Sequence, residues 1–212
     1  MITIVDYGIV NLRNIVRALE HVGGKVLVSR DGKDIEEAER LVLPGVGAFA
    51  SGMTELRSRG LDEVIVNAVN SGTPILGICL GMQMLFEKSL ENGCHAGLGL
   101  IPGDVVPIPR RDPNGLKKRK VPHVGWSELK LAPQRSSWRG TSLSGTSPGE
   151  YVYFLHSFMA TTEEVNWPLA QCIYEGLPVV AAVESENVTG LQFHPERSGP
   201  VGLSILERFL KI

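Results

Sequence analysis

The sequence has few cysteines, no marked excess of charge of either sign and no long apolar run, and each shortage excludes a class of protein. The three cysteines, Cys79, Cys94 and Cys172, are an odd number without metal-type spacing, which argues against a disulfide scaffold and a zinc site. Lysine and arginine total 21 against 23 aspartates and glutamates, so no global charge favours nucleic acid or an anionic membrane. The strongest apolar stretch, Pro74–Met82, is far shorter than the roughly 18–20 residues of a membrane span.

The N-terminus also lacks the features of a targeting segment. It reads MITIVDYG, without a basic stretch and with Asp6 almost at once, so we expect no signal peptide and a cytoplasmic protein. The 212 residues suit one domain at roughly 100–200 residues per domain, and we expect residues 1–212 to form it.

The first half alternates short β-branched runs with helical patterns. Strands are expected at Ile2–Val5, Lys25–Val28, Arg40–Leu43 and Pro74–Ile78. Apolar residues at helical spacing predict three helices. One follows the first strand (Leu12, Ile15, Val16, Leu19, Val22), one precedes the strand Pro74–Ile78 (Leu61, Val64, Ile65, Ala68, Val69) and one follows that strand (Met82, Leu85, Phe86). This order predicts an α/β protein with a mostly parallel central sheet and flanking helices.

The pattern of the second half predicts strands joined by turns. We expect these strands to extend that sheet antiparallel, and a last helix to follow them. The pieces are Asp104–Ile108, Val121–Leu131, Tyr151–Phe158, Leu169–Tyr174, Val179–Glu184 and Thr189–Phe193, followed by the helix Val201–Leu210. Two segments are expected to be loops. The basic Arg110–Lys120 is expected to be solvated, with docking on an acidic or phosphorylated surface as the alternative, and the polar Gln134–Gly149 is expected to be mobile.

The sharpest chemical feature is Gly77-Ile78-Cys79-Leu80-Gly81, between an expected strand and an expected helix. This is the G-x-nucleophile-x-G turn with cysteine as the nucleophile. A nucleophile at the apex of such a strained turn crowds its neighbours two residues away, which favours glycine there. The helix N-terminus would then favour the thiolate. The alternative is a buried structural cysteine in a glycine-flanked turn.

A thiolate nucleophile needs a base and a group that orients the base. His194 and Glu196 stand two residues apart at the end of an expected strand, and Pro195 restricts the backbone between them. Glu196 could therefore hold the imidazole and stabilise its charged form. The alternative is a solvated turn.

A glycine-rich turn, Pro44-Gly45-Val46-Gly47, follows another expected strand. Backbone N–H groups at Val46 and Gly47, with the N–H of Leu80, could stabilise an oxyanion. A plain strand-to-helix turn is the alternative, and a phosphate loop is disfavoured because no Lys-Ser/Thr follows the glycines. Because glycine reorients at little cost, we expect this turn to be able to switch an oxyanion donor on and off.

Taken together, PGVG, GICLG and HPE resemble the class I glutamine amidotransferases along the whole chain. The resemblance implies a catalytic triad of Cys79, His194 and Glu196 and no cofactor or metal. It also implies that substrate glutamine is bound by Gly47, Gln83, His156, Ser157 and Phe158, although Phe158 lacks the hydroxyl of the tyrosine also found there. A satisfied core histidine remains the alternative for His156.

A narrower resemblance is to the glutaminase subunits of imidazole glycerol phosphate synthase. It rests on Asp6–Asn14 (DYGIVNLRN), Val121–Trp126 (VPHVGW) and His194–Ser198 (HPERS). This implies glutamine hydrolysis that supplies ammonia to a (β/α)₈ cyclase partner in histidine biosynthesis. The cyclase would make imidazole glycerol phosphate and aminoimidazole carboxamide ribonucleotide. With no second active site before Ile212, the partner is expected to be a separate chain.

Three other functions stay open at this stage. One is a stand-alone cysteine peptidase or chaperone-like hydrolase, which would act without a partner. Another is a catalytically inactive binding subunit, disfavoured by the intact Cys79, His194 and Glu196. The third is an ammonia-donating subunit of pyridoxal phosphate or purine synthesis, disfavoured by the Asp6–Asn14 opening.

Overall fold

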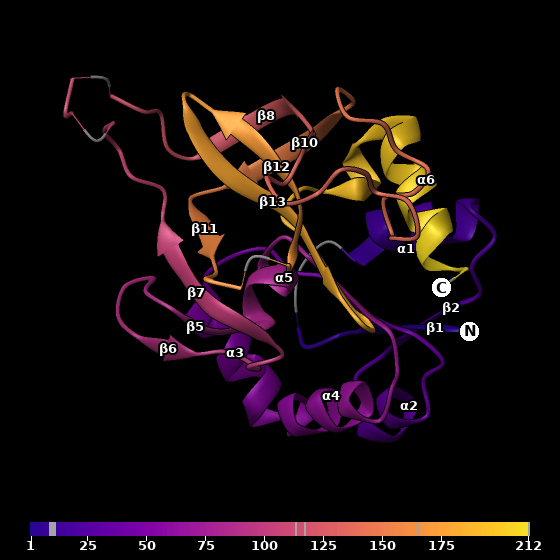
Figure 1. Cartoon of the computed structure of the whole chain (residues 1–212). Coiled ribbons are helices and arrows are strands. Elements are labelled where there is room, and N and C mark those ends of the chain that lie inside the picture. Colours follow the sequence, from indigo (N-terminus) through magenta and orange to yellow (C-terminus); the bar gives the residue numbers. More distant parts are fainter. Residues whose placement is uncertain (9–11, 113, 117, 165, 212) are drawn as a thin grey trace.

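A mixed eight-stranded sheet forms the centre of the molecule (Figure 1). The computed structural model describes residues 1–8, 12–112, 114–116, 118–164 and 166–211. The strands follow one another across the sheet as β2 (Val26–Ser29), β1 (Ile2–Val5), β3 (Leu41–Leu43), β4 (Ile75–Ile78), β14 (Val188–Leu191), β13 (Leu177–Ser185), β12 (Pro168–Tyr174) and β9 (Lys130–Leu131). Neighbours from β2 to β14 are parallel, and β13, β12 and β9 extend the sheet antiparallel. The α/β fold class is confirmed.

Helices cover both faces of this sheet because its strands are apolar on both faces. Side chains alternate along a strand, so Val42 of β3 packs into one core while Leu41 and Leu43 pack into the other. The first core is closed by α1 (Leu12–His21) and α6 (Gly199–Phe209). The second is closed by α2 (Gly32–Glu36), α3 (Phe49–Ser58) and α4 (Leu61–Asn70). The sequence patterns predicted α1, α4 and α6 but missed α2 and α3.

The expectation that all later strands extend the central sheet is wrong. Two of them, β8 (His123–Glu128) and β10 (Tyr151–His156), form a separate two-stranded sheet. Two more, β11 (Phe158–Thr161) and β7 (Ile101–Pro107), lie in a separate sheet with two strands that were not predicted. Its order is β11, β7, β5 (Phe86–Ser89) and β6 (His95–Ala96). The helix after β4 is also shorter than predicted, because α5 (Leu80–Met84) ends before Phe86, which begins β5.

The polar segment Gln134–Gly149 is a loop, as predicted, but it is anchored to the core. Trp138 is buried and its indole N–H donates to the Leu169 carbonyl at 2.8 Å. Leu143 is fully buried beside it. These two apolar side chains fix the loop to the core, although most of the segment is polar, and the prediction of a mobile loop rested on that polar composition.

The basic segment Arg110–Lys120 departs from its prediction at one residue. Arg119 is buried, and its guanidinium donates to the carbonyls of Pro109, Arg111 and Glu175. These three backbone carbonyls thus accept the hydrogen bonds that water would accept from an exposed arginine. Outside the described residues lie Ile9, Val10 and Asn11 of the predicted opening motif, Pro113 and Lys117 of this loop, and Ile212.

Candidate active site

Cys79 lies at the carboxyl end of β4, immediately before α5. Its backbone has φ 53° and ψ −109°, a region that costs a non-glycine residue about 1–3 kcal/mol. A Cβ on Gly77 would lie 2.8 Å from the Met82 Cα, and one on Gly81 only 1.7 Å from the Leu43 carbonyl oxygen. The crowding predicted for a nucleophile turn is therefore present, and glycine relieves it.

His194 comes to Cys79 from far along the chain because β14 is the parallel neighbour of β4. Ile78 and Leu191 are partners in this pair, so the segments that leave the two strands meet at the same edge of the sheet. The Leu191 carbonyl accepts the Cys79 N–H at 2.7 Å. Three residues after Leu191, His194 immediately precedes the short 3₁₀ helix η1 (Pro195–Arg197), which carries Glu196.

His194 and Glu196 form a buried pair of side chains. The His194 Nδ1 lies 2.9 Å from the Glu196 Oε1, and both side chains are less than a tenth exposed. Burial lowers the pKa of His194, but Cys79 and Glu196 raise it more, and the result is a pKa of about 10. The imidazole is thus held with Nδ1 toward the carboxylate, and Nε2 makes no hydrogen bond of good geometry with a described residue.

A pocket of about 270 Å³ opens over Cys79 and His194. It takes in every residue predicted from the sequence for the site except Glu196, which lies behind His194. The lining residues are Val46, Gly47, Cys79, Leu80, Gln83, Glu91, Pro122, Leu155, His156, Ser157, Phe158 and His194.

The glycine-rich turn of residues 44–47 lies at the pocket, but the Leu80 N–H, one of the predicted oxyanion donors, is already used within the protein. The Leu80 N–H donates to the Gly45 carbonyl at 3.3 Å. In a trans peptide the carbonyl and the next N–H point to opposite sides, so the Val46 N–H faces away from Leu80. Gly47 has φ +111°, and apart from its chain neighbours no described residue has an atom within 4 Å of the position that a Cβ would take there, so this end of the turn is not packed against other parts of the fold.

The Gln83 side chain is held by two hydrogen bonds at the pocket wall. Its Nε2 donates to the Phe158 carbonyl at 3.1 Å and to the Gln192 Oε1 at 3.0 Å. Both amide hydrogens are therefore used within the protein, which leaves the amide oxygen as the atom for a ligand.

Two polar residues of the site were missed from the sequence. Glu91 lines the pocket and its Oε2 accepts the Phe49 N–H at the start of α3, at 2.7 Å. Gln192 is fully buried, with its Nε2 at 3.9 Å from the Cys79 sulfur. Gln192 stands in the Gln-Phe-His-Pro-Glu run, so its closeness to His194 was the available signal, whereas no local pattern marks Glu91.

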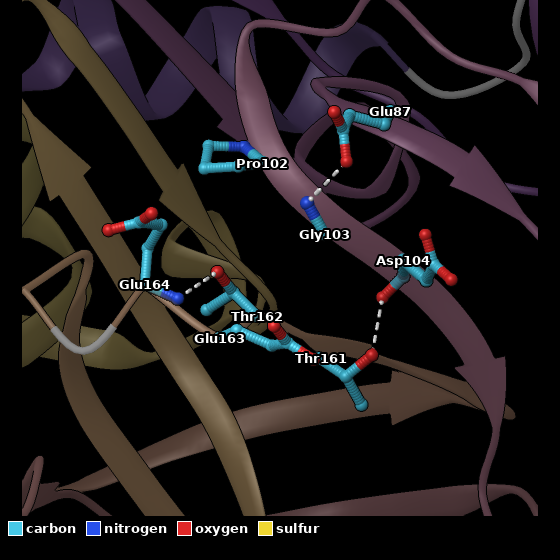
Figure 2. A pocket seen from close by; sticks show the side chains of 8 residues that line it. All are labelled: Glu87, Pro102, Gly103, Asp104, Thr161, Thr162, Glu163 and Glu164. Carbon is cyan, nitrogen blue, oxygen red and sulfur yellow. Dashed lines mark hydrogen bonds between the residues drawn. The ribbon is translucent and has the colours of Figure 1, made fainter.

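A second hollow, of about 450 Å³, lies between β5, β7 and the segment after β11 (Figure 2). Its carboxylates are Glu87, Asp104, Glu163 and Glu164. Glu87 accepts the Gly103 N–H at 3.0 Å, and Asp104 pairs with Lys88 at 3.5 Å. Among the described residues no cluster of His, Cys, Asp or Glu could hold a metal ion. The hollow shares no residue with the pocket over Cys79.

A buried thiol at a strained turn, a His–Glu pair beside it and a pocket over both are the arrangement that a cysteine-dependent amide hydrolase requires. The chain belongs to the glutamine amidotransferase class-I family, whose model matches residues 3–212. Its sequence is similar to imidazole glycerol phosphate synthase subunit HisH 1 of Legionella pneumophila (strain Lens), 44% identical, covering 100% of this chain and 99% of the relative. Subunit HisH of Geobacillus thermodenitrificans is 46% identical, covering 100% of this chain and 96% of the relative.

Solved structures show the same fold at low sequence identity. A structure titled glutamine amidotransferase gives a TM-score of 0.72 at 18% identity, with 98% of each chain covered. PurLQS from Thermotoga maritima gives 0.69 at 22% identity, covering 99% of this chain and 97% of that one. In the part of the chain that the structure describes, no helix is long and apolar enough to cross a membrane.

Proposed function

We propose that this chain hydrolyses L-glutamine to L-glutamate and ammonia and supplies the ammonia to a cyclase partner in histidine biosynthesis. The observation that carries the proposal is Cys79 at its strained turn, in one pocket with His194, which Glu196 orients. The HisH relatives support the substrate and the pathway.

The reaction would proceed in two steps on the sulfur of Cys79. The thiolate attacks the side-chain carbonyl carbon of glutamine, and His194, charged at neutral pH, gives its proton to the departing ammonia. A γ-glutamyl thioester remains. His194 then takes a proton from water, the hydroxide attacks the thioester, and the carbon–sulfur bond breaks. Glutamate leaves, and the Cys79 thiolate beside charged His194 is restored. Glu196 stabilises the imidazolium throughout.

The pocket wall offers complementary groups for the amino-acid end of glutamine. Glu91 is the acidic residue of the lining and can hold the α-ammonium group, while backbone groups at Ser157 and Phe158 can hold the α-carboxylate. The Gln83 amide oxygen is free to accept a further hydrogen bond. No metal or organic cofactor is needed for these steps.

We propose that an oxyanion hole forms here by a peptide rotation, since the Leu80 N–H is now occupied by the Gly45 carbonyl. Turning the Gly45–Val46 peptide over would release the Leu80 N–H and, in the same movement, bring the Val46 N–H toward the site. Val46 is 42% exposed, so its side chain has room to move when the peptide rotates. Loss of one oxyanion donor costs other hydrolases about 10²–10³ in rate, so this rotation is sufficient as a gate.

The partner would dock on the outer face of the β8–β10 ribbon. Val124 and Trp126 on β8 and Tyr151 on β10 are each more than half exposed, an unusual apolar patch for a free surface. Leu155, on the same face, also lines the pocket, so the patch borders the site of ammonia release. We propose a (β/α)₈ cyclase as the occupant, in a heterodimer that makes imidazole glycerol phosphate and aminoimidazole carboxamide ribonucleotide.

We also propose that residues 1–212 act as one domain and that the protein works in the cytoplasm. The match of the family model to residues 3–212 supports the first statement.

The test is glutamate release by the purified chain alone, with the cyclase, and with the cyclase plus its nucleotide substrate. We expect slow release alone and a rise of about 10² or more with both additions. Equal rates in all three would rule out the gate. No glutamate under any condition, from protein whose Cys79 is still alkylated by iodoacetamide, would overturn the assignment of substrate.

A further inference from the structure

Two buried histidines lie side by side at the back of the pocket. His123 on β8 and His156 on β10 are opposite each other in the strand pair, and both are nearly inaccessible. The His123 Nδ1 lies 3.0 Å from the His156 Nε2. The His123 ring is stacked between those of Phe154 and Tyr174, with centroids 4.7 and 3.9 Å away. The hydrolysis described above gives His123 no part.

The hydrogen bonds determine which nitrogen of each ring carries the proton. The Phe158 carbonyl, 2.8 Å from the His156 Nδ1, can only accept, so His156 is protonated at Nδ1. Its Nε2 then accepts from the His123 Nδ1–H, which leaves the His123 Nε2 to accept from the Ser127 hydroxyl at 2.9 Å.

Both rings are neutral, as this arrangement requires. Burial and the nearby charge of His194 lower the pKa of His156 to about 4. Burial and the neighbouring His156 lower the pKa of His123 to about 3. Each ring therefore has one donor and one acceptor at neutral pH, and both are used.

The same chain of hydrogen bonds reaches the substrate wall of the pocket. The Phe158 carbonyl accepts from both His156 and Gln83, so the two side chains share one anchor. His156, Ser157 and Phe158 all line the pocket. By contrast, the backbone of Cys79 is fixed by the β4–α5 turn and by its N–H bond to the Leu191 carbonyl. Its sulfur does touch this region, donating to the Leu155 carbonyl at 3.6 Å and lying 3.9 Å from the Gln192 Nε2.

We infer that His123 is a positioning residue for glutamine: its Nδ1–H holds His156 in one tautomer and thereby holds segment 156–158 in its substrate-binding position. This inference rests on the proposed glutaminase activity. Because His123 bonds to His156 and Ser127, whereas the backbone of Cys79 is set by its own turn, loss of His123 weakens substrate binding far more than it slows the chemical step.

The test compares three variants in the complex with the cyclase and its nucleotide. His123→Phe keeps a stacked ring but removes the donor, and His123→Asn keeps an N–H near the position of Nδ1. Tyr174→Phe keeps the stacking on His123 and the His123 Nδ1–H, and removes the Tyr174 hydroxyl, which donates to the Lys120 carbonyl at 2.6 Å. We expect His123→Phe to raise the KM for glutamine about tenfold with kcat within twofold, the scale of one buried hydrogen bond. His123→Asn should recover most of the affinity, and Tyr174→Phe should match the wild type.

Nitrogen-15 chemical shifts of the histidine rings in the wild-type protein test the proton arrangement without any variant. We expect His123 and His156 both to be neutral and protonated at Nδ1 at pH 7. A His156 protonated at Nε2 would overturn the inference, as would an unchanged KM in His123→Phe or an equal KM rise in Tyr174→Phe. If the wild-type complex releases no glutamate, the proposed function fails, and the ring shifts still decide the hydrogen-bond arrangement.

Discussion

Replacing Glu196 with glutamine tests the pairing that orients His194. The glutamine oxygen can still accept from the His194 Nδ1–H, so the bond of 2.9 Å remains but loses its charge. Charge-assisted hydrogen bonds contribute roughly 1.5–3 kcal/mol and neutral ones about 0.5–1.5, so the expected loss of stability is about 1 kcal/mol. In a protein of this size that lowers Tm by about 2–4 °C. The Glu196 Oε2 has no partner among the described residues, so no second bond is lost.

The pH dependence of that loss has a definite sign. The pKa of folded His194 is raised to about 10 from an unfolded value near 6.5. Its stabilisation is therefore full below pH 6.5 and is lost as the pH rises toward 10. Without the carboxylate the folded pKa falls, so the Tm difference between wild type and Glu196→Gln should be largest near pH 6 and shrink toward pH 10.

Thermal unfolding across pH 5–10 measures this, with Glu207→Gln as a control because Glu207 forms an exposed pair with Lys211. In activity, Glu196→Gln should lose up to about 10⁴ in rate, and less than His194→Ala. A Tm difference that grows with pH, or a larger loss in Glu196→Gln than in His194→Ala, would refute the assigned roles.

Three further predictions concern the thiol, its turn and the docking face. Cys79→Ala should abolish glutamine-dependent cyclisation by the complex but leave ammonia-dependent cyclisation intact; loss of both in an assembled complex would contradict separate sites. Gly81→Ala should destabilise the fold by more than about 3 kcal/mol in thermal unfolding, because its Cβ would lie 1.7 Å from the Leu43 oxygen. Gly32→Ala, with its nearest neighbour at 3.5 Å, is the tolerated control. Trp126→Ala should weaken cyclase binding at least tenfold by titration while iodoacetamide alkylation of Cys79 keeps its rate.

Local sequence was sufficient to find the nucleophile turn and the His–Glu pair. The glycines around Cys79 answer a steric demand within five residues, and Glu196 reaches His194 across one proline. Such short-range constraints can be recognised from the order of residues alone. The roles of these residues as a triad stay a prediction for the experiments above.

The segment between β7 and β10 was predicted less well, because composition is a weak guide to long-range packing. Trp138 anchors a loop that its serines and glycines suggested would be mobile, and Arg119 is buried in a loop that its charges suggested would be solvated. Trp138 bonds to Leu169, 31 residues away, and Arg119 bonds to Glu175, 56 residues away, as well as to two carbonyls of its own loop region. Local composition does not reveal such partners.

The sequence by itself determined which chemical groups are available and where the backbone must bend to present them, because residue type and steric crowding act over a few positions. Only the tertiary structure decided which groups share a pocket. The pairing of His123 with His156 depends on the register of β8 and β10, and the Gly45 carbonyl reaches the Leu80 N–H only because β3 lies beside β4. Strand register and sheet order are set by the packing of whole elements, so the state of the oxyanion turn and the partner of each buried histidine could be known only from the folded chain.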